Sequence, residues 1–141
     1  VKPKGENTVK LYVAGKVGDG TDGVKALIAR LRSLGYRIEY DWTEETAVRK
    51  PYLDHPEVNA IAAGKMLQAS VVCDHFILLV NGNLIGAYIE FGLALASTTT
   101  RPDKRLFVVL NESYRQSIFY TEPRVVICAN VEKLIEKFPA A

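Results

Sequence analysis

The stretch Val71-Val72-Cys73-Asp74-His75-Phe76-Ile77-Leu78-Leu79-Val80 is the most apolar run in the chain. A continuous apolar run, in contrast to an alternating one, is typical of a strand that is buried on both faces of a parallel sheet. We therefore predict that residues 71–80 form the central strand of the fold.

Segments with strand-like and helix-like patterns alternate on both sides of this run. Further strands are predicted at 9–14, 36–40, 105–110 and 125–128, and helices at 24–34, 56–68, 86–96 and 130–138. Residues 43–55 are mixed and polar and are expected to form a loop. This order predicts an α/β fold of the flavodoxin-like, doubly wound kind, with a five-stranded parallel sheet and helices on both faces. The length suits a single domain over residues 1–141.

The composition excludes several classes of protein. The 141 residues are 48% hydrophobic and 24% charged, and the net charge is +2, so a compact globular domain is expected and a binder of polymeric nucleic acid is not. Two histidines and two cysteines, Cys73 and Cys128, have no metal-site spacing, and both thiols are expected to be buried and free. No apolar stretch is long enough to span a membrane, and the polar start does not resemble a signal peptide. A cytoplasmic protein is expected.

Ligands of such sheets bind beyond the carboxyl ends of the strands. This rule selects Gly15–Gly23, Asp41-Trp42, Asn81–Glu90 and Asn111–Tyr114.

The first of these segments contains Gly18-x-Gly20-x-x-Gly23, which formally matches a dinucleotide-binding fingerprint. The extra residues after Gly15 and the acidic side chains within the motif count against a bound pyrophosphate. A flexible loop, or a loop that closes over a small sugar or nucleotide, remains open. Lys16 would offer a cation to a phosphate or simply be solvated.

Glu90 is the residue in these segments with the clearest chemistry. It is expected in about the second turn of a helix that starts near residues 84–86, where the helix dipole would keep it ionised. Its apolar neighbours would keep it poorly hydrated, which suits a nucleophile that attacks an electrophilic carbon. Gly86 and Gly92 would let a ligand approach closely. The alternative is a glutamate that serves the helix dipole only.

Several motifs together resemble the nucleoside 2-deoxyribosyltransferase family, which includes deoxynucleoside 5′-monophosphate N-glycosidases. They are Gly86-x-x-x-Glu90-x-Gly92-x-Ala94 with the preceding 74–80 segment, Leu11-Tyr12-Val13-Ala14-Gly15, Asp41-Trp42-Thr43 and the segment 117–125. The resemblance spans most of the chain.

The resemblance implies a flavodoxin-like fold and a two-step, retaining reaction on a 2′-deoxyribonucleoside or its 5′-monophosphate. Glu90 would attack C1′ and displace the base, and water or a second base would then resolve the glycosyl-enzyme. No cofactor or metal is implied. The family's habit implies a homodimer or a larger homo-oligomer, in which a partner subunit can complete the site.

One departure from the family concerns the acid that assists the leaving base. The family commonly has an aspartate eight residues before the position of Asp74, and this chain has Met66 there. A position that is polar in some members is Leu84 here, with Asn83 next to it. Asp41 is the best replacement acid by position, unless it only caps a turn.

Other candidates each have a structural alternative. Tyr12 is catalytic or part of the core, and Trp42 stacks on a base or packs at an edge. Asn81 and Asn83 bind base or sugar or simply form a turn. Gly15, Lys16 and Gly86 complete the predicted substrate site. The competing hypotheses are a nucleotide-binding or regulatory module that has lost turnover, and a small dinucleotide-binding domain.

Overall fold

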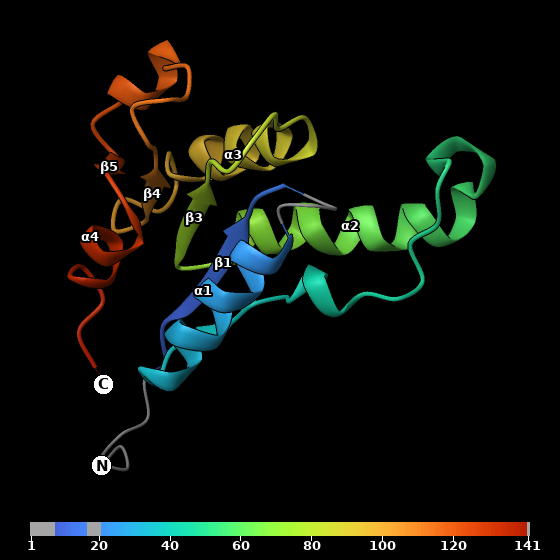
Figure 1. Ribbon diagram of the computed structural model, residues 1–141, viewed down its shortest axis with the longest axis horizontal. Coiled ribbons are helices and arrows are strands. Elements are labelled where there is room, and N and C mark those ends of the chain that lie inside the picture. The colour runs from blue at the N-terminus through green and yellow to red at the C-terminus, as the bar shows by residue number, and fades with distance from the viewer. Residues whose placement is uncertain (1–7, 17–20, 141) are drawn as a thin grey trace.

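The computed structural model describes residues 8–16 and 21–140 of the chain. Within these residues, strands and α-helices alternate along the sequence (Figure 1). In order, they are β1 (Lys10–Ala14), α1 (Thr21–Ser33), β2 (Arg37–Ile38), α2 (Pro56–Val72), β3 (His75–Leu79), α3 (Gly86–Ser97), β4 (Arg105–Val109), β5 (Val125–Cys128) and α4 (Val131–Ile135). Three short 3₁₀ helices are η1 (Trp42–Glu44), η2 (Tyr52–Asp54) and η3 (Ile118–Thr121).

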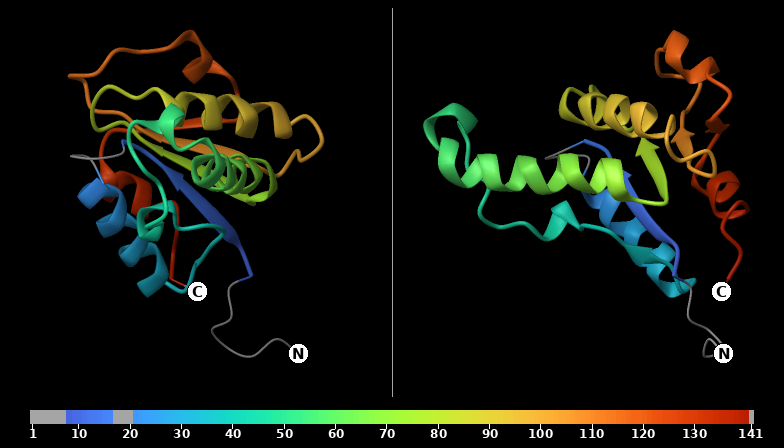
Figure 2. Two further views of the ribbon diagram at one scale, coloured as in Figure 1. Left: turned by 90° about the vertical axis from the view of Figure 1, so that its right-hand side faces the viewer. Right: turned by 180° about the vertical axis from the view of Figure 1, so that it is seen from behind.

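The strands form one sheet in the order β2-β1-β3-β4-β5, and every neighbouring pair is parallel. Helices α2 and α3 pack against each other on one face, and α1 and α4 cover the other (Figure 2). An ion pair between Arg30 of α1 and Glu132 of α4 joins the second pair of helices. The predicted flavodoxin-like, doubly wound α/β fold is therefore confirmed.

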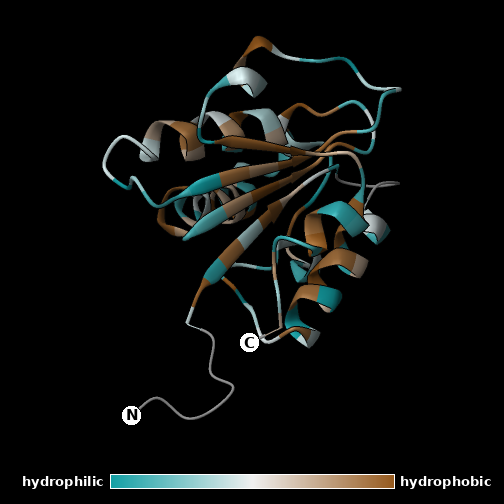
Figure 3. Cartoon of the chain, turned by 90° about the vertical axis from the view of Figure 1, so that its left-hand side faces the viewer, coloured by the Kyte–Doolittle hydropathy of each residue, from teal (hydrophilic) through white to brown (hydrophobic). Residues whose placement is uncertain are grey.

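The strands are hydrophobic along most of their length, and β1, β3 and β4 each begin with a hydrophilic residue (Figure 3). The side chains of β1, β3 and β4 beyond that first residue are buried on both faces, as the central position of these strands requires. Cys73 and Cys128 are buried and free, as expected. No helix in the described part of the chain is long and apolar enough to cross a membrane.

The prediction of a strand over residues 71–80 was wrong at its start, because α2 continues to Val72 and β3 is shorter. Side chains from the α3–β4 connection stabilise this helix end. Lys104 Nζ donates to the carbonyl oxygens of Ser70 and Val71 at 2.8 and 3.0 Å, and Arg101 donates to that of Val72 at 2.7 Å. Carbonyls at a helix end need such partners, and an apolar pattern does not reveal partners that lie 30 residues away.

The prediction that residues 43–55 form a plain loop was also incomplete, because η1 and η2 bracket this segment. In Figures 1 and 2 this segment runs alongside α2 to the N-terminal end of that helix. Asn59 of α2 fixes it there: its side-chain amide bonds to both backbone groups of Arg49 and to the carbonyl oxygen of Tyr52. The segment is thereby positioned to form one wall of a cavity.

Candidate functional site

Glu90 and Tyr12 face each other between α3 and the sheet. Tyr12 is fully buried in β1, and Glu90 is the fifth residue of α3, with most of its surface covered. Tyr12 Oη and Glu90 Oε2 are both buried and interact with each other, but neither atom makes a hydrogen bond of standard geometry within the described residues. Buried polar groups nearly always make such bonds, so a pair without them needs an explanation such as a missing ligand or a functional role.

The electrostatics of this pair differ from the sequence-based expectation. Burial raises the pKa of the Glu90 carboxyl, and the nearby Tyr12 hydroxyl acts in the opposite direction. Burial and the negative charge of Glu90 raise the pKa of Tyr12 above its usual range. The sequence analysis expected the helix dipole to keep Glu90 ionised, but burial has the larger effect and acts in the opposite direction. The dipole acts mainly within the first turn of a helix, and Glu90 lies beyond that turn.

Aromatic rings continue from Tyr12 through the layer between the sheet and α3. Tyr12 and Phe76 have ring centroids 5.8 Å apart, Phe76 and Phe91 6.2 Å, and Phe91 and Tyr120 5.8 Å. These contacts are within the range of favourable aromatic pairs. They hold Tyr12 in place and make the surroundings of Glu90 apolar.

A cavity of about 430 Å³ lies between α2, η1 and the start of α1. Trp42 and Met66, two residues that the sequence selected, both line it. Trp42 is held by a hydrogen bond of 2.7 Å from its indole nitrogen to the carbonyl oxygen of Val13 in β1. The described lining residues are Thr21, Trp42, Thr43, Glu45, Val48, Tyr52, Asn59, Ala62, Ala63 and Met66.

Glu45 also lines this cavity, and the sequence analysis missed it. Its carboxylate accepts hydrogen bonds from Tyr40 Oη at 2.9 Å and from the Ala47 amide at 3.1 Å. The Ala47 and Tyr40 bonds lower the pKa of Glu45, and burial with the Glu45 bond raises the pKa of Tyr40 to about 12. The charge of Tyr40 is also a minor contributor to the raised pKa of Tyr12.

Asp41 is engaged as a cap. Its Oδ1 accepts from the Thr43 amide at 3.1 Å and from the Thr43 hydroxyl, and its Oδ2 lies 3.2 Å from Arg32. It is therefore the N-cap of η1, which is the structural alternative that the sequence left open, and it is absent from the lining of the cavity.

The loops after β1 and β3 meet at the carboxyl edge of the sheet. The Lys16 amide donates to Asn81 Oδ1 at 3.1 Å, and the Lys16 side chain lies over Gly82. A side chain at Gly15 would lie 2.6 Å from Val24, so packing against α1 by itself explains this glycine. Gly18 and Gly20 of the glycine motif fall outside the described residues, and Gly23 lies in the first turn of α1.

The remaining predicted substrate residues, Asn83 and Gly86, follow shortly after Asn81 in the sequence, and both are exposed. Asn83 is exposed in the turn before α3, and Gly86 is the exposed first residue of that helix. Neither lines the cavity beside Trp42.

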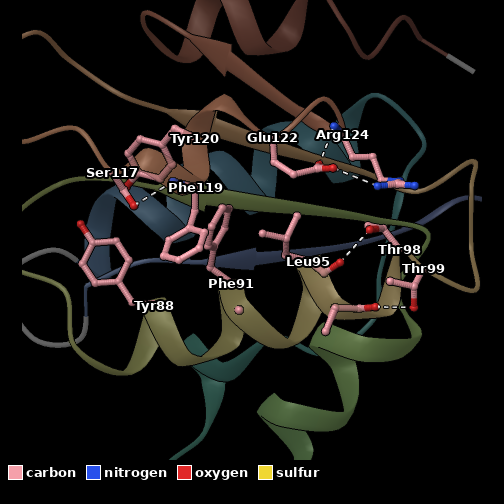
Figure 4. A pocket seen from close by; sticks show the side chains of 12 residues that line it. Tyr88, Phe91, Leu95, Thr98, Thr99, Ser117, Phe119, Tyr120, Glu122 and Arg124 are labelled. Carbon is pink, nitrogen blue, oxygen red and sulfur yellow. Dashed lines mark hydrogen bonds and ion pairs between the residues drawn. The ribbon is translucent and has the colours of Figure 1, made fainter.

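A larger cavity of about 700 Å³ lies between α3 and the segment around η3 (Figure 4). Its walls are mainly apolar and include Tyr88, Phe91 and Phe119, and Glu122 and Arg124 lie at one end. Glu90 lines neither of the two cavities. Both cavities have a carboxylate in their lining, Glu122 in the larger one and Glu45 in the smaller one. The smaller one is lined by Trp42, a predicted substrate residue, and by Met66, which stands where an acid was expected, so we take it as the candidate site.

No group of three or more His, Cys, Asp or Glu side chains within residues 8–16 and 21–140 is placed to hold a metal ion.

The fold is similar to that of a CMP N-glycosidase from Clostridium botulinum, BcmB. The TM-score is 0.59, the sequence identity is 16%, and the match covers 91% of this chain and 96% of that chain. At this identity the likeness concerns the fold. No protein-family model and no curated protein sequence matches the chain.

Proposed function

We propose that the chain cleaves or exchanges the N-glycosidic bond of a 2′-deoxyribonucleoside or its 5′-monophosphate, with Glu90 as the nucleophile. The observation that carries this proposal is the buried pair of Glu90 and Tyr12, without hydrogen bonds of standard geometry, in a flavodoxin-like sheet. The fold likeness to a CMP N-glycosidase supports a reaction of this class.

The Glu90 carboxylate would attack C1′, and the C1′–N bond would break as the base leaves with the bonding electrons. The leaving base takes up a proton from solvent. Water or a second base then attacks C1′, the bond between C1′ and the Glu90 carboxylate breaks, and the attacking group gives up its proton to solvent. A desolvated carboxylate is a stronger nucleophile than a hydrated one, so the apolar surroundings favour the attack. Tyr12 would position Glu90 and support its charge. No cofactor is required for these steps.

The cavity beside Trp42 is our candidate for the base-binding site. Its volume is within the range of about 300–1,000 Å³ for small-molecule sites. The Trp42 side chain is mostly buried, at 7% exposure, and its indole nitrogen bonds to Val13; the part of the ring that lines the cavity would contact the base. Lys16 and Asn81, at the adjoining carboxyl edge, would bind the sugar or its 5′-phosphate. Such a nucleotide substrate fits a cytoplasmic enzyme.

We also propose that the chain forms a homodimer or a larger homo-oligomer through α2 and α3. Ile61 and Ile89 are 62% and 60% exposed on these helices. Gly64 and Gly92 follow them by three residues on the same helix faces, and a side chain at either glycine would meet nothing within 4 Å. A mid-helix glycine costs about 1 kcal/mol relative to alanine. The close approach of a helix from a second copy would explain that cost.

The experiment is to incubate the protein with a panel of 2′-deoxynucleosides and their 5′-monophosphates and to measure the released base by chromatography. Intact-protein mass measurement during turnover would look for a deoxyribosyl adduct that Glu90→Ala abolishes. Base release that is unchanged in Glu90→Ala would refute the proposed mechanism.

A second candidate is a nucleotide-binding module of the same fold with weak or no turnover. Met66 favours it, because an apolar side chain occupies the cavity where the family commonly has its acid. Asp41 does not compensate, since its oxygens are used by Thr43 and Arg32. Calorimetric binding of a nucleotide without release of its base would support this candidate over the enzyme.

A further inference from the structure

The cavity beside Trp42 contains one charged lining residue among the described residues, and this residue is Glu45. The other lining side chains are uncharged: aromatic, aliphatic, hydroxyl-bearing, an amide and the thioether of Met66. A single charged group in a mostly apolar cavity is a strong source of ligand specificity, since a few polar groups orient what the apolar walls hold.

Three other polar side chains of the cavity, those of Trp42, Thr43 and Asn59, are already used within the protein. The Trp42 indole nitrogen donates to Val13, and the Thr43 hydroxyl donates to Asp41. Both hydrogens of the Asn59 amide go to the carbonyl oxygens of Arg49 and Tyr52. These groups shape the cavity, but their donors are not free for a ligand.

Glu45, in contrast, is held in place with acceptor capacity left. Tyr40 Oη bonds to Oε2 and the Ala47 amide to Oε1, which leaves a second lone pair on each oxygen. Lys65 Nζ is 3.9 Å from Oε2, beyond hydrogen-bond distance, and its side chain is 53% exposed. The carboxylate is thus fixed and ready to accept hydrogen bonds from a ligand.

The short helix η1 sets Glu45 relative to the tryptophan. The Glu45 amide donates to the Trp42 carbonyl oxygen at 3.2 Å, and Asp41 caps the start of the same turn. One hydrogen-bonded turn therefore brings the mostly buried indole of Trp42 and the Glu45 side chain to the wall of the same cavity.

We propose that Glu45 determines the base specificity of the site by accepting hydrogen bonds from the exocyclic amino group of the base. The inference rests on the proposed function for its ligand, a nucleoside or nucleotide. Glu45 is a specificity-determining residue here and takes no part in the bond cleavage itself.

The chemistry of the base edges gives the direction of the preference. An ionised carboxylate only accepts hydrogen bonds, so it pairs with the amino groups of cytosine, adenine or guanine. Uracil and thymine present a carbonyl oxygen at the position where cytosine has its amino group, and this oxygen would meet the carboxylate with its own lone pairs. The low pKa of Glu45 keeps it in the accepting form at neutral pH.

The test uses 2′-deoxycytidine and 2′-deoxyuridine 5′-monophosphates. Their bases differ in the group at C4, which is amino in cytosine and carbonyl in uracil, and in N3, which accepts a hydrogen bond in cytosine and donates one in uracil. Trp42 is the single tryptophan of the chain, so its fluorescence reports binding at the cavity directly. Dissociation constants are measured for the wild-type chain, Glu45→Gln and the neighbouring control Glu44→Gln, whose side chain is 70% exposed. The release of base is measured in parallel.

We expect the wild-type chain and Glu44→Gln to bind the cytosine nucleotide about 10- to 100-fold more tightly, as one charge-assisted hydrogen bond allows. Glu45→Gln should bring this ratio close to one, chiefly by weakening the cytosine nucleotide. A wild-type ratio near one, an unchanged ratio in Glu45→Gln, or an equal loss for both nucleotides would overturn the inference.

The two proposals fail separately in this experiment. Selective binding that depends on Glu45 but is not followed by base release would remove the enzymatic proposal and support the inference. Base release that depends on Glu90 without discrimination between the two nucleotides would support the enzyme and remove the inference.

Discussion

Replacing Glu90 with glutamine tests whether the buried carboxyl serves the reaction while lowering the stability of the folded chain. Glu90 Oε2 is buried without a hydrogen bond of standard geometry, and burial raises the pKa of the carboxyl. The glutamine amide has the same shape and no charge, and it can donate to Tyr12 Oη. We therefore expect Glu90→Gln to be more stable than the wild-type chain at neutral pH and to lose base release.

The magnitude follows from the cost of a buried polar group without a partner, which is about 1–3 kcal/mol. Taking the lower end, Glu90→Gln should raise the free energy of unfolding by about 1 kcal/mol. For a chain of this size that corresponds to an increase of roughly 3–4 °C in Tm. Base release should fall by at least about 10³-fold if Glu90 is the nucleophile.

The pH dependence supplies the sharper part of the test. Because the pKa of Glu90 is raised in the folded state, the folded chain binds more protons than the unfolded chain between the two pKa values. The stability of the wild-type chain therefore falls as the pH rises from the ordinary glutamate value of about 4.3 through the raised value. Glutamine does not titrate, so the advantage of Glu90→Gln should grow over this window and then stay constant.

The assay is thermal unfolding by circular dichroism of both proteins from pH 4 to pH 8. Glu136→Gln is the matched control, because Glu136, the C-cap of α4, pairs with Lys133 and its side chain is 61% exposed. A Tm difference for Glu90→Gln that does not change with pH, or a variant that is less stable at pH 8, would refute the reasoning.

Three further predictions follow from other parts of the structure. Tyr12→Phe removes the hydroxyl that lowers the pKa of Glu90, so the acidic limb of the pH–rate profile should move to higher pH and base release should fall about tenfold; an unmoved limb would contradict this. Ile89→Glu places a charge on the exposed face of α3 and should convert an oligomer to a monomer in light scattering, and an oligomer of unchanged size would exclude this face as the interface. Lys104→Met leaves the carbonyl oxygens at the end of α2 without their partner and should lower the free energy of unfolding by about 2–3 kcal/mol in urea titration. Unchanged stability would show that water replaces Lys104 there.

Local patterns predicted most of the fold. The alternation of apolar strands and amphipathic helices is a local property, and with the handedness rule for parallel strands it leads to one arrangement of layers. The errors lie at element ends, as at Val72, because Lys104 and Arg101 stabilise that end from a distant part of the chain. Hydrophobic periodicity contains no information about such partners.

The candidate site was predictable in part. Glu90 was selected by its motif and Trp42 by its place after a strand, and the structure places Tyr12 against Glu90 and Trp42 in a cavity. Glu45 was not selected, because nothing in the sequence of the 43–55 segment shows that the Glu45 side chain lines the same cavity as Met66 of α2. The packing of that segment on α2 decides this.

The sequence by itself determined the order of the elements, the parallel sheet and the residues at its carboxyl edge, because these depend on spacing along the chain. Only the tertiary structure decided the direction in which the pKa of Glu90 is shifted, the use of Asp41 as a cap and the cavity that joins Trp42 to Glu45. Desolvation and hydrogen bonding depend on which atoms surround a group in three dimensions. For that reason, burial opposes the charge on Glu90 even though its sequence position near a helix start suggests the opposite.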